Sequence, residues 1–222
     1  MNINLIDYDR IDKSVFACLI TYMGEMKDGL GTYQDISESD YYHAYNAVGS
    51  YESVLEHMYF TFYIEGISRA CSHQLVRHRI ASYTQRSQRH RGDEGFDYVV
   101  PHTIRNNPIA LGVYKNTIEL LQRNYTMMVD EFGIPKEDAR YILPNACATD
   151  IMVTMNVRAL REFFQKRCCR LAQWEIREVA NEMLRMCHDI YPKLFEGCRG
   201  FCGGDYDVLG CPYKGRCLEV LE

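Results

Sequence analysis

An alternation of apolar and polar residues beginning at Met58 constrains the fold of this chain more than any other feature. Every second residue from Met58 to Ile64 is strongly apolar, and the residues between them are Tyr or Thr. A period of two places side chains alternately on the two faces of a β-strand, and aromatic and β-branched residues favour the same structure. We therefore expect a strand that ends at Gly66, followed by a helix from Ser68 to about Arg79.

Helical periodicity and capping residues account for most of the remaining chain. Ser39 or Asp40 is expected to cap a helix that begins at Tyr41, after a polar loop from Gly29. The other predicted elements are an opening strand at Leu5–Ile6, helices over Ile11–Met23, Pro108–Phe132, Val157–Arg167 and Glu175–Leu194, a helix from Pro135, and a strand over Ala148–Met155. Few strands and several long helices predict an α+β fold, in which helices pack on a small, mostly antiparallel sheet.

The segment from Arg77 to Arg89 has an unusual composition. It holds four Arg, one His, two Ser and two Gln, with no Lys and no carboxylate before Asp93. A guanidinium is a planar fork suited to a phosphate or a polar ring edge, and Ser and Gln add neutral donors. The composition predicts a pocket for a phosphorylated ligand with a polar ring; the alternative is an Arg-rich helix end on the surface.

The expected backbone of this segment supports the same interpretation. On a helix that reaches Arg79, Gln74, Arg77 and His78 would share one face, because they are three and four positions apart. From Ser82 the chain is expected to run as an extended loop with backbone N–H groups free to bind an anion.

Length and charge restrict the classes of protein that remain. A chain of 222 residues suits one domain, expected over residues 1–196, with a Cys- and Gly-rich tail over residues 197–222. The net charge of −5 argues against a general nucleic-acid binder. There is no secretory signal at the N-terminus and no apolar run of the roughly 18 residues that span a bilayer, so we expect a cytoplasmic protein without a membrane segment.

The ten cysteines suggest reduced thiols in a cytosolic enzyme, not a secreted scaffold. Six lie in apolar or helical patterns, and the other four are Cys198, Cys202, Cys211 and Cys217 in the tail. The tail spacings of three, eight and five residues differ from the paired short spacing of common zinc sites. We predict no metal, and expect reduced thiols or a redox-labile bridge in the tail; a tail zinc site remains the alternative.

The chain resembles the flavin-dependent thymidylate synthase family in four blocks that occur in the family's order. The family signature, Arg-His-Arg followed by seven residues and Ser, corresponds to Arg77–Arg79 and Ser87. The other blocks are Glu56–His57, Ile134–Arg140 with Leu143–Pro144, and Asn156–Arg158 with Arg167 and Ala172–Arg177. The resemblance implies the family's α+β fold and its reaction, the reductive methylation of dUMP to dTMP. Methylenetetrahydrofolate would donate the carbon, FAD reduced by NADPH would carry the hydride, and the active sites would lie at subunit interfaces of a homotetramer.

The resemblance also implies which residues form the site. Arg167 would be catalytic, contacting the uracil and favouring its N3-deprotonated form, as a preorganised guanidinium beside a developing anion can. The residues implied to bind dUMP are Gln74, Arg77, Gln85, Arg86, Ser87, Gln88, Arg89, Arg140 and Arg167. Those implied to bind FAD are Ser53, Arg77, His78, Arg79, Gln85, Asn156, Arg158 and Glu162.

Simpler roles exist for several of these residues. Arg140 could form a surface ion pair with Glu137, and Arg167 could satisfy carbonyls at a helix end. Glu56 and His57 could orient the flavin or support the signature helix, and Trp174 is expected in the core.

Three positions depart from the family pattern. Tyr51 stands where the family usually has His, His90 stands where it has Tyr, and Glu162 stands where it often has Asn or His. A carboxylate near a flavin phosphate would be repulsive. The departures at Tyr51 and Glu162 motivate an alternative function, a nucleotide-binding sensor of the same fold that lacks flavin chemistry. Bound flavin would distinguish the two.

Overall fold

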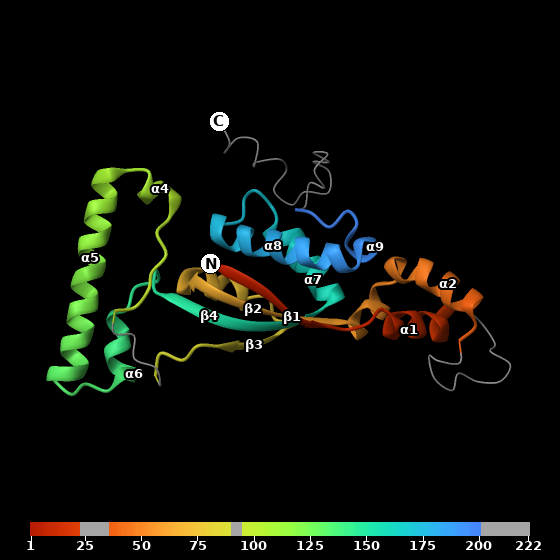
Figure 1. Cartoon of the computed structure of the whole chain (residues 1–222), viewed down its shortest axis with the longest axis horizontal. Helices are drawn as coiled ribbons and strands as arrows, with labels where there is room; N and C mark the ends of the chain where they lie inside the picture. Colours follow the sequence, from red (N-terminus) through yellow and green to blue (C-terminus); the bar gives the residue numbers. More distant parts are fainter. Residues whose placement is uncertain (23–35, 90–94, 201–222) are drawn as a thin grey trace. The chain divides into compact units, whose positions relative to one another are not determined.

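The computed structural model of the chain describes residues 1–22, 36–89 and 95–200. Its sheet has four strands in the order β1-β2-β4-β3 (Figure 1). Their bounds are β1 Asn2–Tyr8, β2 Tyr59–Ser68, β3 Ser82–Gln85 and β4 Ala148–Asn156. A small antiparallel sheet with many helices confirms the predicted α+β class.

Helices make up most of the remaining described chain. The α-helices are α1 Asp12–Tyr22, α2 Glu38–Ala47, α3 Arg69–Leu75, α4 His102–Arg105, α5 Pro108–Thr126, α6 Lys136–Ala139, α7 Val157–Arg167, α8 Trp174–Ile190 and α9 Pro192–Phe195. Shorter turns of 3-10 helix are η2 Val48–Ser50, η3 Glu52–His57 and η5 Arg140–Ile142, and a π-helical turn, η4, covers Met127–Glu131. In the part of the chain described, none of these helices is both long and apolar enough to cross a bilayer.

Strand β2 follows the predicted alternation, since Phe60, Phe62 and Ile64 are fully buried. The prediction that Gly66 ends the strand is wrong, because β2 continues to Ser68. Gly66 has a φ of +70°, which glycine adopts without the usual steric cost, and its N–H donates to Asp150 Oδ1 of β4 at 3.1 Å. The strand is therefore kinked at Gly66, not terminated.

Helix α3 is shorter than predicted. Ser68 caps its start, but the helix ends at Leu75, so Arg77, His78 and Arg79 follow it. The hydroxyl of Tyr83, a residue of β3, donates a hydrogen bond to the Leu75 carbonyl at 2.9 Å. The chain must reverse between these elements, and the expectation that Arg77 and His78 share a helix face with Gln74 is wrong.

Other boundaries differ for local reasons. Ser37 caps α2, because its side chain accepts a hydrogen bond from the Asp40 N–H. The cap therefore lies two residues before Ser39, the first of the two predicted caps. The predicted helix to Leu194 breaks after Ile190, and Pro192 starts α9. Trp174, predicted in the core, is half-buried.

The chain divides into two compact units. Unit 1 contains residues 1–2, 64–77 and 83–152, and unit 2 contains residues 3–63, 78–82 and 153–222. In unit 1, Phe96, Ile118 and Cys147 form a small core with Tyr98 and Tyr114 packed against it. In unit 2, the buried residues of α7 and α8 include Phe163, Phe164, Ile176, Val179, Ala180, Met183 and Cys187, so both helices bury an apolar face.

Candidate functional site

In unit 1, the end of β3 and the loop after it carry most of the residues expected to bind dUMP. The Gln85 amide donates to Ser72 Oγ at 2.8 Å and reaches Thr149 Oγ1 at 3.3 Å. The Arg86 guanidinium donates to the Ala148 carbonyl at 3.0 Å and lies 3.4 Å from the Asp150 carboxylate. These contacts fix the loop on β4, so Gln85 and Arg86 position their neighbours as well as offering polar groups.

The backbone of this loop is partly engaged. The Arg86 N–H donates to the Asp150 carbonyl at 2.9 Å, and the Arg89 N–H donates to Ser87 Oγ at 3.2 Å. The expectation that these N–H groups are free for an anion is therefore wrong at both positions. Arg69, which sequence reasoning missed, donates to the Arg86 carbonyl at 2.7 Å and holds the start of the loop.

Arg89 and Arg140 meet at one residue, Glu137, although they are far apart in the sequence. Nε and Nη2 of Arg89 lie 3.0 and 2.8 Å from Glu137 Oε2. Arg140 Nε donates to the main-chain carbonyl of Glu137 at 3.0 Å. The carboxylate is thus paired with Arg89, whereas Arg140 is held through the backbone. An anion that binds at Arg89 would have to displace the Glu137 carboxylate from that guanidinium.

The other residues expected to bind dUMP in unit 1 are Gln74, Arg77 and Gln88. Gln88 Nε2 lies 3.7 Å from Cys147 Sγ. Gln74 is half-buried on α3, and Arg77 is exposed just after that helix.

In unit 2, the start of α7 carries residues expected to bind FAD. Asn156 caps α7, with its Oδ1 accepting from the Ala159 N–H at 2.8 Å, and it is 7% exposed. Arg158 forms ion pairs with Glu56 at 2.5 Å and Glu52 at 3.3 Å. Glu56 therefore holds the first turn of α7 through Arg158.

Further along α7, Glu162 lies 3.6 Å from Lys166, and Arg167 is the half-buried last residue of the helix. The sequence predicted the bounds of α7 correctly, because its cap and its apolar face agree.

His78 packs against α7. Its ring centroid lies 5.7 Å from that of Phe163, in an edge-to-face arrangement. Burial lowers the pKa of His78, and the nearby charges of Lys166 and Arg167 act in the same direction, while Glu162 and a hydrogen bond to the Ala159 backbone oppose them. The lowered pKa favours a neutral imidazole near neutral pH. Arg79, like Ser53 on η3, is exposed.

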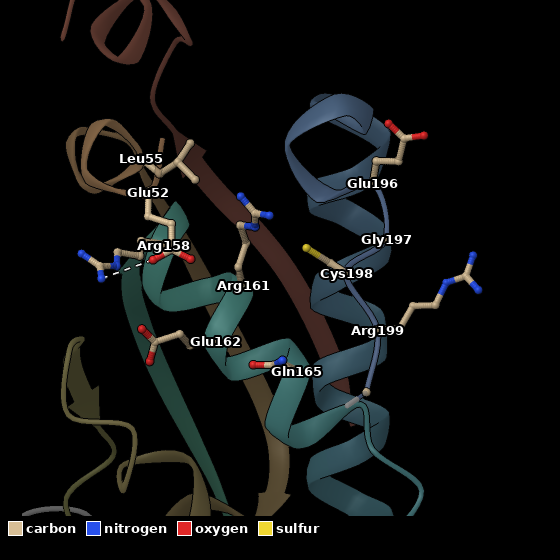
Figure 2. A pocket seen from close by; sticks show the side chains of 11 residues that line it. Glu52, Leu55, Arg158, Arg161, Glu162, Gln165, Glu196, Gly197, Cys198 and Arg199 are labelled. Carbon is tan, nitrogen blue, oxygen red and sulfur yellow. Dashed lines mark ion pairs between the residues drawn. The ribbon is translucent and has the colours of Figure 1, made fainter. Parts of the chain in front are cut away.

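A cavity of about 270 Å³ opens beside α7 in unit 2 (Figure 2). Arg158 and Glu162, both expected near FAD, contribute to its wall. The other lining residues are Glu52, Leu55, Arg161, Gln165, Glu196, Gly197, Cys198, Arg199 and Gly200. Helical spacing could have identified Arg161 and Gln165, which lie three positions after Arg158 and Glu162 respectively. Nothing in the sequence indicated the segment after α9.

The structure thus groups the predicted residues in two sets. Unit 1 holds Gln74, Arg77, Gln85 to Arg89 and Arg140, while unit 2 holds Ser53, His78, Arg79, Asn156, Arg158, Glu162 and Arg167. Among the described residues, no group of three or more His, Cys, Asp or Glu side chains could hold a metal ion. His90, Cys202, Cys211 and Cys217 lie outside the described residues.

Comparisons with known proteins agree on one family. A family model described as thymidylate synthase complementing protein matches residues 4–193. A flavin-dependent thymidylate synthase of Geobacter sulfurreducens is 52% identical over 177 residues, covering 78% of this chain and 73% of that protein. A Clostridium tetani protein of the same name is 42% identical over 206 residues, covering 85% of this chain and 83% of its own length.

Solved structures share the fold. Thymidylate synthase X from Helicobacter pylori, crystallised with FAD and dUMP, superimposes with a TM-score of 0.67 at 23% identity. The match covers 89% of this chain and 99% of that chain.

Proposed function

The chain belongs to the thymidylate synthase complementing protein family and catalyses the flavin-dependent synthesis of thymidylate, and we propose that the two sets of residues described above perform this reaction. dUMP is reductively methylated to dTMP; FAD is the cofactor, and methylenetetrahydrofolate and NADPH are co-substrates. The alternative of a nucleotide sensor without flavin chemistry is not favoured, since the relatives are enzymes.

The assignment of the dUMP site rests on one observation, the meeting of Arg89 and Arg140 at Glu137. A nucleotide monophosphate carries nearly two negative charges at neutral pH, and paired guanidinium groups are suited to it. We assign the phosphate to Arg89, Arg140 and Ser87, where it would displace the single carboxylate of Glu137 from Arg89. Gln85 and Arg86 hold this loop on β4, and Gln74, Arg77 and Gln88 supply further donors.

The residues of unit 2 fit a flavin in most respects. Asn156 offers a hydrogen-bond donor and Arg158 offers a guanidinium, while His78 is held by a hydrogen bond to the Ala159 backbone. An incoming diphosphate would have to compete with Glu52 and Glu56 for Arg158, and Glu162 would repel it. We therefore assign Arg158 and Glu162 to less charged parts of the cofactor. When bound, FAD supplies the hydride carrier of the reaction.

Arg167 is the proposed catalytic residue. Lys166 precedes Arg167 in the last turn of α7, and the positive charges of both residues lower the pKa of His78. These two charges make the surroundings of the last turn locally positive. Such a field lowers the cost of a negative charge on a uracil ring held beside it. Arg167 would thus favour the N3-deprotonated pyrimidine, whose C5 is the more electron-rich and attacks the carbon donor.

We also propose a cytoplasmic homotetramer with folate and dUMP bound at subunit interfaces. The exposed positions of Arg77 and Arg79 support this, since both side chains are accessible to another subunit. Light scattering should give four times the 25.9 kDa chain mass, and a monomeric mass would contradict the proposal. Cell fractionation would test the location.

Flavin spectroscopy tests the function directly. Purified protein with added FAD should show bound flavin bands that bleach after anaerobic addition of NADPH, and faster when dUMP is present. Arg158→Ala should weaken FAD binding about tenfold, in line with the loss of one charged hydrogen bond. Arg185→Ala, which removes an exposed arginine paired with Glu182, is the matched control. Absence of bound flavin at saturating FAD would favour the sensor.

Arg140→Ala tests the dUMP site. We expect the KM for dUMP to rise roughly 10- to 100-fold, because a charged hydrogen bond to phosphate contributes about 1.5–3 kcal/mol. Arg140→Lys should recover part of the loss, and Arg123→Ala, an exposed arginine on α5, should leave KM unchanged. An unchanged KM with a lower melting temperature in Arg140→Ala would instead assign Arg140 to holding the turn after α6.

A further inference from the structure

The residues after α9 fold back onto the end of α7. Gly197 has a φ of +70°, and the Cys198 N–H donates to the Phe195 carbonyl at 3.0 Å, which turns the chain. A Cβ at Gly200 would lie 2.7 Å from Cys169 Cα and 3.2 Å from the carbonyl carbon of Cys168. The backbone of Gly200 therefore touches the backbone at Cys168 and Cys169, a contact that only glycine permits.

This contact brings three thiols of unit 2 into one region. Cys168, Cys187 and Cys198 are all free of disulfides. Burial raises the pKa of Cys168 to about 12, with a smaller contribution from Cys198, and Cys198 contributes to the raised pKa of Cys187 as well. Two thiols influence each other's ionisation only when they lie close together.

The three thiols differ in access. Cys187 is fully buried on α8, whereas Cys168 and Cys198 are half-buried. Cys198 lines the cavity beside α7, and Figure 2 shows its side chain directed from the returning segment toward that helix. Burial raises the pKa of Cys198, and a hydrogen bond and the positive charge from Arg161 oppose that rise. An oxidant can therefore reach Cys198 from the cavity, beside a cation that stabilises its thiolate.

We propose that Cys198 is an oxidation site and that it forms a reversible disulfide with Cys168. The oxidant is a small-molecule disulfide such as oxidised glutathione. The Cys198 thiolate attacks one sulfur of the oxidant and releases one small thiol, leaving a mixed disulfide. The Cys168 thiolate then attacks Cys198 Sγ and releases the second small thiol, so the protein loses two electrons and two protons.

Cys168 is the preferred partner because of the backbone contact. Gly200, two residues beyond Cys198, holds the returning segment against the peptide that joins Cys168 to Cys169, and Cys168 is the half-buried residue of the two, whereas Cys169 is 3% exposed. Cys168 also caps the C-terminal end of α7, with its N–H donating to the Phe164 carbonyl at 2.8 Å. The disulfide would therefore tie the segment after α9 to the residue that follows Arg167. This chemistry is independent of the function proposed above.

Peptide mapping of the full chain tests the pairing. Reduced protein is incubated with oxidised glutathione, its remaining thiols are alkylated, and it is digested with trypsin without reduction. The three thiols fall in separate peptides, Cys168–Arg170, Met186–Lys193 and Leu194–Arg199. We expect Leu194–Arg199 to be linked to Cys168–Arg170, and the link to disappear with dithiothreitol.

Single variants complete the test. The link should be absent in Cys168→Ala, where Cys198 should retain glutathione, and present in Cys169→Ala, which shares the same peptide. A link from Leu194–Arg199 to Met186–Lys193, a link to a peptide beyond residue 200, or glutathione alone on wild-type Cys198 would each overturn the proposal.

The rate of formation supplies a second readout. Because burial raises the pKa of both thiols, only a small thiolate fraction is present near neutral pH. That fraction, and with it the rate, should increase about tenfold for each unit of pH below the pKa. A rate that does not change between about pH 7 and pH 8 would contradict attack by these buried thiols.

Discussion

Arg167→Ala should lower kcat for dTMP formation by about two to three orders of magnitude, the loss seen when one preorganised donor to a developing anion is removed. The guanidinium lies in the last turn of α7 beside Lys166, so its removal takes away one of the two positive charges proposed to act on the uracil ring. FAD binding should change less than kcat, because Asn156 and Arg158, two of the proposed flavin contacts, lie at the opposite end of α7 from Arg167. Single-turnover oxidation of the reduced flavin with dUMP and methylenetetrahydrofolate measures the effect.

The pH profile separates a catalytic role from a structural one. Without Arg167, deprotonation of N3 is no longer assisted, so the activity of Arg167→Ala should continue to rise at higher pH than that of the wild type. Arg167→Lys keeps the positive charge but not the planar guanidinium, so its activity should lie between those of the wild type and Arg167→Ala. Arg170→Ala, an exposed position three residues later, is the control. A kcat within threefold of wild type in Arg167→Ala would reject the assignment.

Phe163→Ala should destabilise the protein by about 3–5 kcal/mol, the usual cost of removing a buried aromatic side chain. Phe163 is fully buried on α7, 5.9 Å from the ring of Phe164 and 5.7 Å from the ring of His78. The cavity left behind would also remove the surface against which His78 is held. Urea denaturation measures the change in the free energy of unfolding. FAD titration measures whether FAD binding weakens when His78 loses the surface that holds it.

A neighbouring position provides the control for this substitution. Gln165 is exposed on the same helix, and Gln165→Ala should change the free energy of unfolding by no more than about 0.5 kcal/mol. A loss below about 1 kcal/mol in Phe163→Ala would mean that the contacts of α7 with the core are much weaker than its burial indicates.

The sequence predicted those elements whose signals are local. Strand β2 and helix α7 follow from periodicity, and the cap at Asn156 marks the start of α7. The end of α3 could not be predicted in this way, because the Tyr83 hydroxyl and the pairing of β3 with β4 decide where the chain turns. No local pattern reports a tertiary partner.

The same distinction applies to the site. The family resemblance identified Arg89 and Arg140, but their meeting at Glu137 depends on how α6 and η5 are placed relative to the loop after β3. The pairing of Arg158 with Glu52 and Glu56 likewise depends on η3 packing beside α7. The segment after α9 was missed, because its return rests on backbone contacts at Gly200.

The cap at Asn156 has a consequence for how a ligand is recognised. Its Oδ1 is committed to the Ala159 N–H, which fixes the orientation of the side-chain amide. Only the Nδ2 group is then turned away from the helix, so this position can offer a hydrogen to a ligand acceptor but no lone pair. Asp at this position would preserve the helix start and reverse the polarity presented to the ligand. The start of one helix thereby determines which edge of a bound molecule the protein can accept.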